Sequence, residues 1–254
     1  MRPQYQINKN EIENVVLHVS GHVDSLKKDQ KNWKQLSEQK LWEEMVSCIL
    51  GSRTNFEIAF FYASMLSAKK LIDIEGIIDD PFFAEEAIKQ LLESPLFVSS
   101  KYGKYMKYPF YHSRSEYIVR TALNIYKNEN TTLKNILSKC NSEFEAREIL
   151  HELVIGMGYK QTSLFLRNIG YSHNLAILDT HVLKYMTYME LLSDFSKSDI
   201  SNKRKYIRTE KILNKYAISW NKNISRLDIA IWVVMRLLEK EYSYGNCNFG
   251  VGRY

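Results

Sequence analysis

Lys160 and Asp179 are the side chains in this 254-residue sequence whose types and spacing best suit chemistry. Lys160 follows the run Gly156-Met157-Gly158 by two residues and falls in the first turn of an expected helix. The helix dipole there disfavours a positive charge and so favours the neutral, nucleophilic amine. Asp179 begins another expected helix and can face Lys160 if the short segment between them folds back. An amine beside a carboxylate suits attack on an electrophilic carbon by a Schiff-base route, in which the carboxylate stabilises positive charge and moves protons.

The glycine run lies between two amphipathic helical patterns, which predicts a helix-hairpin-helix. Glycine adopts positive φ without a Cβ clash, and the second helix begins with N–H groups that no helical carbonyl accepts. Such a turn can hold a phosphate, although by itself it supports only nonspecific binding to DNA. The apolar faces of the two arms are Ala146, Ile149, Leu150 and Leu153 before the turn, and Leu164, Phe165 and Ile169 after it.

Helical periodicity also dominates the rest of the chain, so we expect an all-α fold. Asn55 can cap one helix, in which Ala59 and Phe60 widen the apolar stripe until burial on most sides is expected. Asp179 is a natural N-cap of another helix. Ser113 or Ser115 can cap a helix over about residues 115–126, and Asn141 or Ser142 can cap the first hairpin arm. Besides that helix and the hairpin arms, the expected helices lie at about residues 41–51, 55–65, 79–95, 133–137, 179–186, 203–220 and 227–238.

Composition limits the compartment and the kinds of site. The net charge of +6 and the pI near 9.0 fit a polyanionic partner without requiring one. Cys48, Cys140 and Cys247 are odd in number and far apart, so neither a disulfide framework nor a zinc site is indicated. No signal peptide or 18-residue apolar span is evident, and we expect a soluble cytoplasmic protein without a membrane partner.

The stretch Lys101–His112 alternates basic and aromatic residues around one glycine and one proline, which predicts a loop. Such a loop can contact phosphates and stack on bases, but an aromatic loop packed on the core has the same composition. No repeat or linker divides the chain, so one helical domain, undivided or cleft into two lobes, is expected over residues 36–240. It lies between an N-terminal segment of unknown role, residues 1–35, and a C-terminal tail without periodicity, residues 241–254.

Two stretches carry a resemblance to a known family. Residues Ile155–Gly170, followed by Leu175–Leu183, resemble the hairpin and the Gly/Pro-Asp loop of the 8-oxoguanine DNA glycosylase/AP lyases. Within the helix-hairpin-helix glycosylase superfamily, they are most similar to the compact archaeal and bacterial second type. Weaker similarity extends over Leu41–Leu50, over Arg114–Ile118, and over Leu227-Asp228 with Trp232.

The resemblance implies an all-α, two-lobed helix-hairpin-helix glycosylase fold with double-stranded DNA bound across the cleft and the damaged base flipped into a pocket. Lys160 would then attack C1′, displace an oxidised purine, most simply 8-oxoguanine, and form an imine that leads to strand cleavage by β-elimination. Asp179 would support the oxocarbenium-like transition state. Gly156, Met157 and Gly158 would grip a phosphate through backbone N–H groups. No cofactor or side-chain metal site is expected, although in the family a monovalent cation can assist through carbonyls of the hairpin backbone.

The resemblance extends to three further residues, each with an ordinary alternative. Arg53 lies near the position at which superfamily members place a residue that fills the gap left by the flipped base, and it can equally be a plain surface arginine. His181 can contact a phosphate or the aspartate, or simply lie on a helix surface. Trp232 can stack on the flipped base or belong to the core. Thr180 departs from the arginine common in the family. Residues 241–254 follow Lys240, near which the family chains typically end, so the identity of the damaged base that the protein recognises stays open.

Two alternatives to 8-oxoguanine excision stay open. A bifunctional glycosylase of the same superfamily that acts on different damage would also use Lys160, whereas monofunctional adenine or alkyl-base glycosylases usually lack such a lysine. A non-catalytic helix-hairpin-helix DNA-binding protein would need neither Lys160 nor Asp179. In each case we expect a monomer in the cytoplasm, associated with the nucleoid if the source is prokaryotic.

Overall fold

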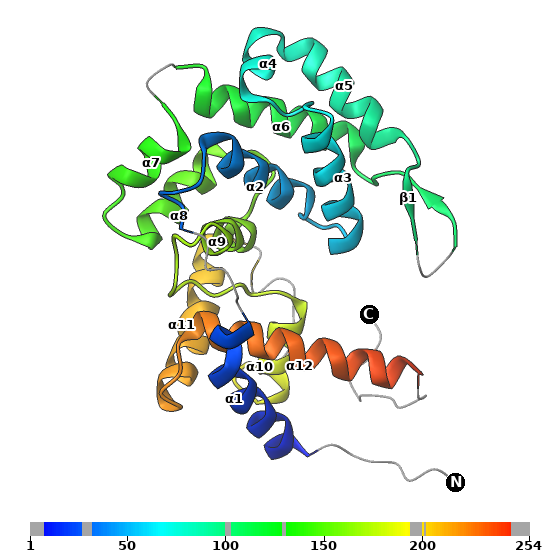
Figure 1. Cartoon of the computed structure of the whole chain (residues 1–254). Helices are drawn as coiled ribbons and strands as arrows, with labels where there is room; N and C mark the ends of the chain where they lie inside the picture. The colour runs from blue at the N-terminus through cyan, green and yellow to red at the C-terminus, as the bar shows by residue number, and fades with distance from the viewer. Residues whose placement is uncertain are drawn as a thin grey trace. The chain divides into compact units, whose positions relative to one another are not determined.

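The chain is helical, with a single two-stranded ladder in the part that a computed structural model describes: residues 8–26, 32–99, 103–128, 131–193, 200 and 202–244. The all-α prediction is confirmed (Figure 1). The helices are α1 (Lys9–Leu26), α2 (Glu38–Leu50), α3 (Phe56–Ala68), α4 (Ile74–Asp79), α5 (Pro81–Glu93), α6 (Tyr111–Tyr126), α7 (Leu133–Lys139), α8 (Glu143–Leu153), α9 (Tyr159–Asn168), α10 (Thr180–Tyr188), α11 (Lys203–Ser219) and α12 (Ile224–Tyr244). The strands are β1 (Phe97–Val98) and β2 (Tyr105–Met106), which pair antiparallel.

The chain divides into two compact units. Residues 31–172, here called the hairpin unit, contain α2 to α9 and the ladder. Residues 1–30 and 173–254, here called the aspartate unit, contain α1 and α10 to α12. The functional boundaries at residues 35 and 240 stay a prediction, and the part of the tail from residue 245 onward lies outside the described residues.

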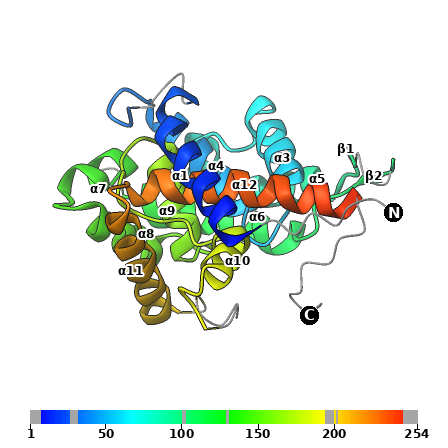
Figure 2. The ribbon, with the colours of Figure 1, turned by 90° about the horizontal axis from the view of Figure 1, so that it is seen from below.

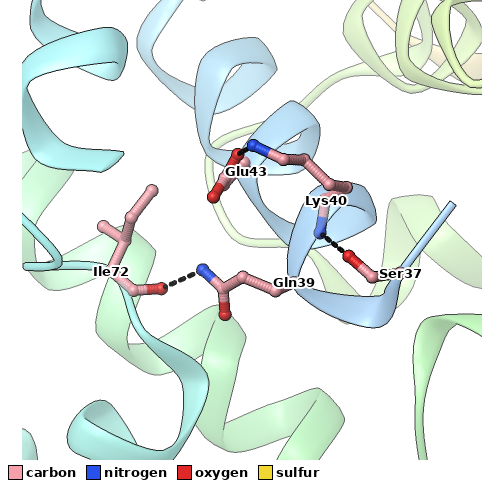
Figure 3. A network of polar contacts seen from close by, with 5 residues as sticks. All are labelled: Ser37, Gln39, Lys40, Glu43 and Ile72. Carbon is pink, nitrogen blue, oxygen red and sulfur yellow. Dashed lines mark hydrogen bonds and ion pairs between the residues drawn. The ribbon is translucent and has the colours of Figure 1, made fainter. Parts of the chain in front are cut away.

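Helix α2 is the central core helix of the hairpin unit. Ser37 caps it by accepting the N–H of Lys40 at 3.2 Å. The side chains of Gln39 and Trp42 donate to one carbonyl, that of Ile72, at 3.1 and 2.9 Å. Figure 3 shows Gln39 reaching across to Ile72, and Lys40 pairing with Glu43 along the same helix. The buried Trp42 and the half-buried Gln39 therefore fix the segment before α4 against α2.

Glu38, at the start of α2, joins this helix to two others. Its carboxylate accepts the Tyr126 hydroxyl at 3.0 Å and the N–H groups of Leu133 and Lys134 at 2.6 and 3.2 Å, so it caps α7 from a distance in sequence. Burial and, secondarily, the Glu38 charge raise the pKa of Tyr126, which keeps its hydroxyl protonated as a donor. The ends of α2, α6 and α7 are thereby held together.

Three local expectations in this unit are wrong. Part of Lys101–His112 is not a loop: it forms β2, and α6 begins at Tyr111 without a cap from Ser113 or Ser115. The Tyr62 hydroxyl pins the ladder by donating to the Ser94 and Met106 carbonyls at 2.6 and 2.8 Å. Phe60, expected to be buried, is 58% exposed. The expectation failed because an apolar stripe that covers most of a helix does not tell which side meets the core.

The aspartate unit is organised around α12. Helix α1 lies across it in Figures 1 and 2, and α10 and α11 also pack against it. The sequence pattern did not identify α1, yet its Ile12, Val16 and Val23 are buried at helical spacing. None of the described helices combines the length and the apolar composition that a bilayer span requires.

Candidate active site

The predicted hairpin is present in the hairpin unit, with five residues between the end of α8 and the start of α9. Ser142 caps α8, and Gly170, at φ +76°, follows α9, as expected. The two glycines of the turn differ in backbone conformation. Gly156 has φ +81°, which favours glycine, whereas Gly158 is extended at φ −90°, where any residue is accommodated. Gly158 offers no side-chain cap to α9, so it leaves the first N–H groups of the helix available to an anion.

One face of α6 holds the turn in place. The Tyr117 ring occupies the space beside Gly156, such that a Cβ added there would lie 2.3 Å from Tyr117 Cδ2. Thr121 Oγ1 accepts the N–H of Ile155 at 3.0 Å, and Asn124 Nδ2 donates to the Leu153 carbonyl at 2.9 Å. Residues 117, 121 and 124 repeat at helical spacing, so the sequence carries a signal for this face of α6.

The turn is also bonded internally. His151 Nδ1 donates to the Met157 carbonyl at 3.1 Å, and the Thr162 hydroxyl and N–H both donate to the Gly158 carbonyl. The Met157 side chain is buried. The turn is thus a rigid element that presents backbone rather than side chains.

The contrast between the two glycines gives a test of the turn. Gly156→Ala is expected to lower the free energy of unfolding by more than about 2 kcal/mol, because it combines positive φ with a clash against Tyr117. Gly158→Ala meets no heavy atom within 4 Å and is expected to change stability by less than about 0.5 kcal/mol. Thermal unfolding measures both. If a phosphate approaches Gly158, the added methyl group weakens DNA binding in a fully folded protein; unchanged binding would place the phosphate elsewhere.

Lys160 lies half-buried in the first turn of α9. Among the described residues of the hairpin unit, no carboxylate pairs with its amine. The next residue, Gln161, is buried, and its amide nitrogen lies 3.4 Å from the place that a Cβ on Gly51 would occupy. The beginning of α9 is therefore packed against the end of α2.

Arg53 lies exposed in the loop that follows, two residues after Gly51, with φ +60°. Two buried side chains stiffen this loop. Arg114 Nη2 donates to the Ser52 carbonyl at 3.0 Å, and the Tyr108 hydroxyl donates to the Leu50 carbonyl at 2.6 Å. The Arg114 guanidinium also lies 5.2 Å from the Tyr117 ring centre, so one side chain connects the Arg53 loop with the ring beneath the hairpin turn. The structure thus brings the Arg53 loop close to the start of α9.

Asp179 belongs to the aspartate unit and is the predicted N-cap. Its Oδ1 accepts the N–H of Val182 at 2.9 Å, which leaves Oδ2 for other chemistry. The side chain is half-buried, and the preceding four residues are buried. Because Lys160 lies in the other unit, the predicted pairing of amine and carboxylate stays a prediction.

His181 and Trp232 lie together in the aspartate unit, with ring centres 6.5 Å apart and planes almost perpendicular. His181 Nδ1 is 3.5 Å from a Glu239 carboxylate oxygen but lacks hydrogen-bond geometry, while Lys184 pairs with the same carboxylate at 2.6 Å. Trp232 is 37% exposed and borders a surface hollow with Arg236, whose guanidinium lies 4.9 Å from the Trp232 ring centre. Trp232 is thus not a core residue, and its ring is accessible to a ligand. Its stacking on a base stays a prediction.

No cluster of three or more His, Cys, Asp or Glu that could hold a metal occurs among residues the structure describes.

Comparison with known proteins gives one consistent family. Residues 23–222 match the model of a family described as 8-oxoguanine DNA glycosylase. The 8-oxoguanine DNA glycosylase/AP lyase of Methanocaldococcus jannaschii is 31% identical over 83% of this chain and 87% of the relative. The enzyme of the same name from Sulfolobus acidocaldarius is 29% identical over 77% of this chain and 82% of the relative. The crystal structure of the Methanocaldococcus enzyme superposes with a TM-score of 0.66 at 25% identity, covering 94% of both chains, and a second structure of it contains a 15-mer DNA with 8-oxoguanine.

Proposed function

Because the chain belongs to the 8-oxoguanine DNA glycosylase family, we propose that it is a base-excision repair enzyme that releases 8-oxoguanine from double-stranded DNA and then cleaves the strand as an AP lyase. The observation that carries the proposal is the placement of Lys160 in the first turn of α9, directly after a rigid hairpin turn built to present backbone N–H groups. A turn that only bound phosphate would not require a lysine there.

The chemistry assigned to Lys160 accounts for both activities. The damaged nucleotide must first leave the base stack, because C1′ is inaccessible inside the duplex. The neutral Lys160 amine forms a bond to C1′ while the glycosidic bond breaks and its electron pair leaves with the purine. Opening of the sugar ring converts the adduct to an imine. Loss of a C2′ proton then expels the 3′ phosphate, and hydrolysis of the imine frees Lys160.

Asp179 is assigned to charge and proton control. Its Oδ2 is not used by the helix cap and can stabilise positive charge that develops on the sugar, or accept the proton from the lysine. As in the sequence prediction, we propose that it acts in the reaction together with Lys160.

The remaining proposed contacts with DNA position the duplex and the flipped base without taking part in the reaction. The hairpin turn would grip a phosphate through its N–H groups, the stiff Arg53 loop would fill the gap left by the flipped base, His181 would contact a phosphate, and Trp232 would stack on the extruded base. We also propose, from the family resemblance, that backbone carbonyls of the hairpin hold a monovalent cation, which would add positive charge near the phosphate. We further propose that the enzyme acts as a monomer in the cytoplasm.

A related lesion is the second candidate. Helix α12 continues past Lys240 to Tyr244, close to the point at which the family resemblance places recognition of the base. A difference at this position would change which damaged base is recognised, but it would not change the roles assigned to Lys160 and Asp179.

An excision assay across lesions tests the proposal. Duplexes carrying 8-oxoguanine or another damaged base, opposite each of the four normal bases, are incubated with the protein, and base release and strand cleavage are measured separately. Both products are expected with 8-oxoguanine, and DNA binding should weaken as salt rises because phosphate contacts release counterions. Activity confined to another lesion would establish the related enzyme. Binding without release from any duplex would leave a non-catalytic DNA-binding protein.

A further inference from the structure

The backbone N–H groups of the three residues just before Asp179 are held by side chains from α11 and α12. Glu210 Oε1 accepts the N–H of Ala176 at 3.0 Å, and Asp228 Oδ2 accepts the N–H of Ile177 at 2.6 Å. The Tyr206 hydroxyl accepts the N–H of Leu178 at 3.3 Å and donates to the Ala176 carbonyl at 2.9 Å. The segment 176–178 is thereby held by a hydrogen bond at every residue.

These side chains are unusual for their burial. Asp228 is 2% exposed, Glu210 is 5% exposed, and Tyr206 is fully buried. Removing a carboxylate from water is costly unless hydrogen bonds compensate, and helices packed by apolar residues do not need two such groups. Both carboxylates are directed at N–H groups within three residues of Asp179.

The contacts hold Asp179 from its N-terminal side, while its cap bond to Val182 holds it from the other. The N–H of Asp179 itself donates to the Ile177 carbonyl at 2.9 Å, so the residue that Asp228 anchors is bonded directly to Asp179. A capping bond alone would fix the carboxylate only relative to α10. The segment 176–178 fixes it relative to α11 and α12 as well.

We propose that Tyr206, Glu210 and Asp228 are positioning residues that act on the reaction through Asp179. The inference rests on the proposed catalytic role of Asp179. A small displacement of a catalytic group costs rate without changing the affinity for substrate, because orientation matters chiefly in the transition state. A fold anchor, in contrast, would affect stability and leave the rate of correctly folded enzyme unchanged.

Two tyrosines of α11 provide a matched test. Tyr206→Phe removes the hydroxyl that holds residues 176 and 178. Tyr216→Phe removes a hydroxyl that bonds Glu13 and Tyr185, outside this segment. Under single-turnover conditions with 8-oxoguanine duplex, Tyr206→Phe is expected to lower the rate of base release about tenfold with unchanged DNA affinity. Tyr216→Phe is expected to retain the wild-type rate, and thermal unfolding confirms that both are folded.

The same substitutions in an Asp179→Asn background identify the route of the effect. If Tyr206 acts through Asp179, Tyr206→Phe no longer lowers the residual rate when the carboxylate is absent. A full tenfold loss in that background, or equal losses for Tyr206→Phe and Tyr216→Phe in active enzyme, would overturn the positioning role alone. Absence of base release by the wild type would instead overturn the proposed function, and this inference with it.

Asp228→Asn supplies an independent variant. An asparagine keeps a carbonyl oxygen that can accept the Ile177 N–H, so a rate closer to wild type than that of Asp228→Ser is expected at equal DNA affinity. Equal rates for Asp228→Asn and Asp228→Ser, both folded, would contradict the role of this hydrogen bond.

Discussion

Lys160→Ala is expected to abolish strand cleavage and the covalent adduct that borohydride traps on duplex DNA containing 8-oxoguanine. Alanine cannot form the imine, so no adduct survives, and base release should fall by at least about 10³-fold. DNA binding should persist, because the phosphate contacts assigned to the hairpin come from its backbone. Gel analysis of trapped complexes measures the adduct, and fluorescence anisotropy measures the affinity.

Lys205→Ala is the matched control, since Lys205 also lies in the first turn of a helix but is exposed on α11. It is expected to retain both activities. Strand cleavage that persists in Lys160→Ala would assign the nucleophile to another amine. Loss of the adduct together with loss of DNA binding would make Lys160 a phosphate contact, since a nucleophile contributes little to binding the intact duplex.

The parts of the site that the sequence predicted are those with short-range causes. Ser142 and Asp179 cap their helices through bonds to residues three positions later, and Gly170 ends α9 through its own backbone conformation. The all-α fold follows from periodicity in the same way. In each case the residues that decide the structure lie within one turn of it.

The parts that the sequence could not predict depend on contacts between distant residues. Thr121 and Ile155, which fix the hairpin turn, are 34 positions apart, and Ile177 and Asp228 are 51 apart. Helix periodicity shows that a face is buried but not what it meets. For this reason the expected burial of Phe60 is wrong, and the sequence does not predict the Tyr117 ring beside Gly156. Polar residues on apolar faces, such as Asp228, were the available signal.

Asp179→Asn is expected to lower the rate of base release by about 10²- to 10⁴-fold while the protein stays folded. The asparagine oxygen can still accept the Val182 N–H, so the cap of α10 is retained and the free energy of unfolding should change by less than about 0.5 kcal/mol. What is lost is the negative charge near the sugar. DNA affinity should stay equal or rise, because a carboxylate is removed from the surface that is proposed to bind the phosphates. Single-turnover rates, unfolding curves and binding isotherms measure the three effects.

Asp179→Ala separates capping from catalysis. It removes the charge and the cap together, so its rate should match that of Asp179→Asn while its stability falls by a further ~1 kcal/mol. If Asp179 only capped α10, neither variant would lose the rate of the folded enzyme: Asp179→Asn would be nearly as active as the wild type, and Asp179→Ala would lose activity only in proportion to unfolding. A near-wild-type rate for Asp179→Asn would therefore remove the carboxylate from the mechanism. It would also leave the three anchoring side chains behind Asp179 with a purely structural purpose.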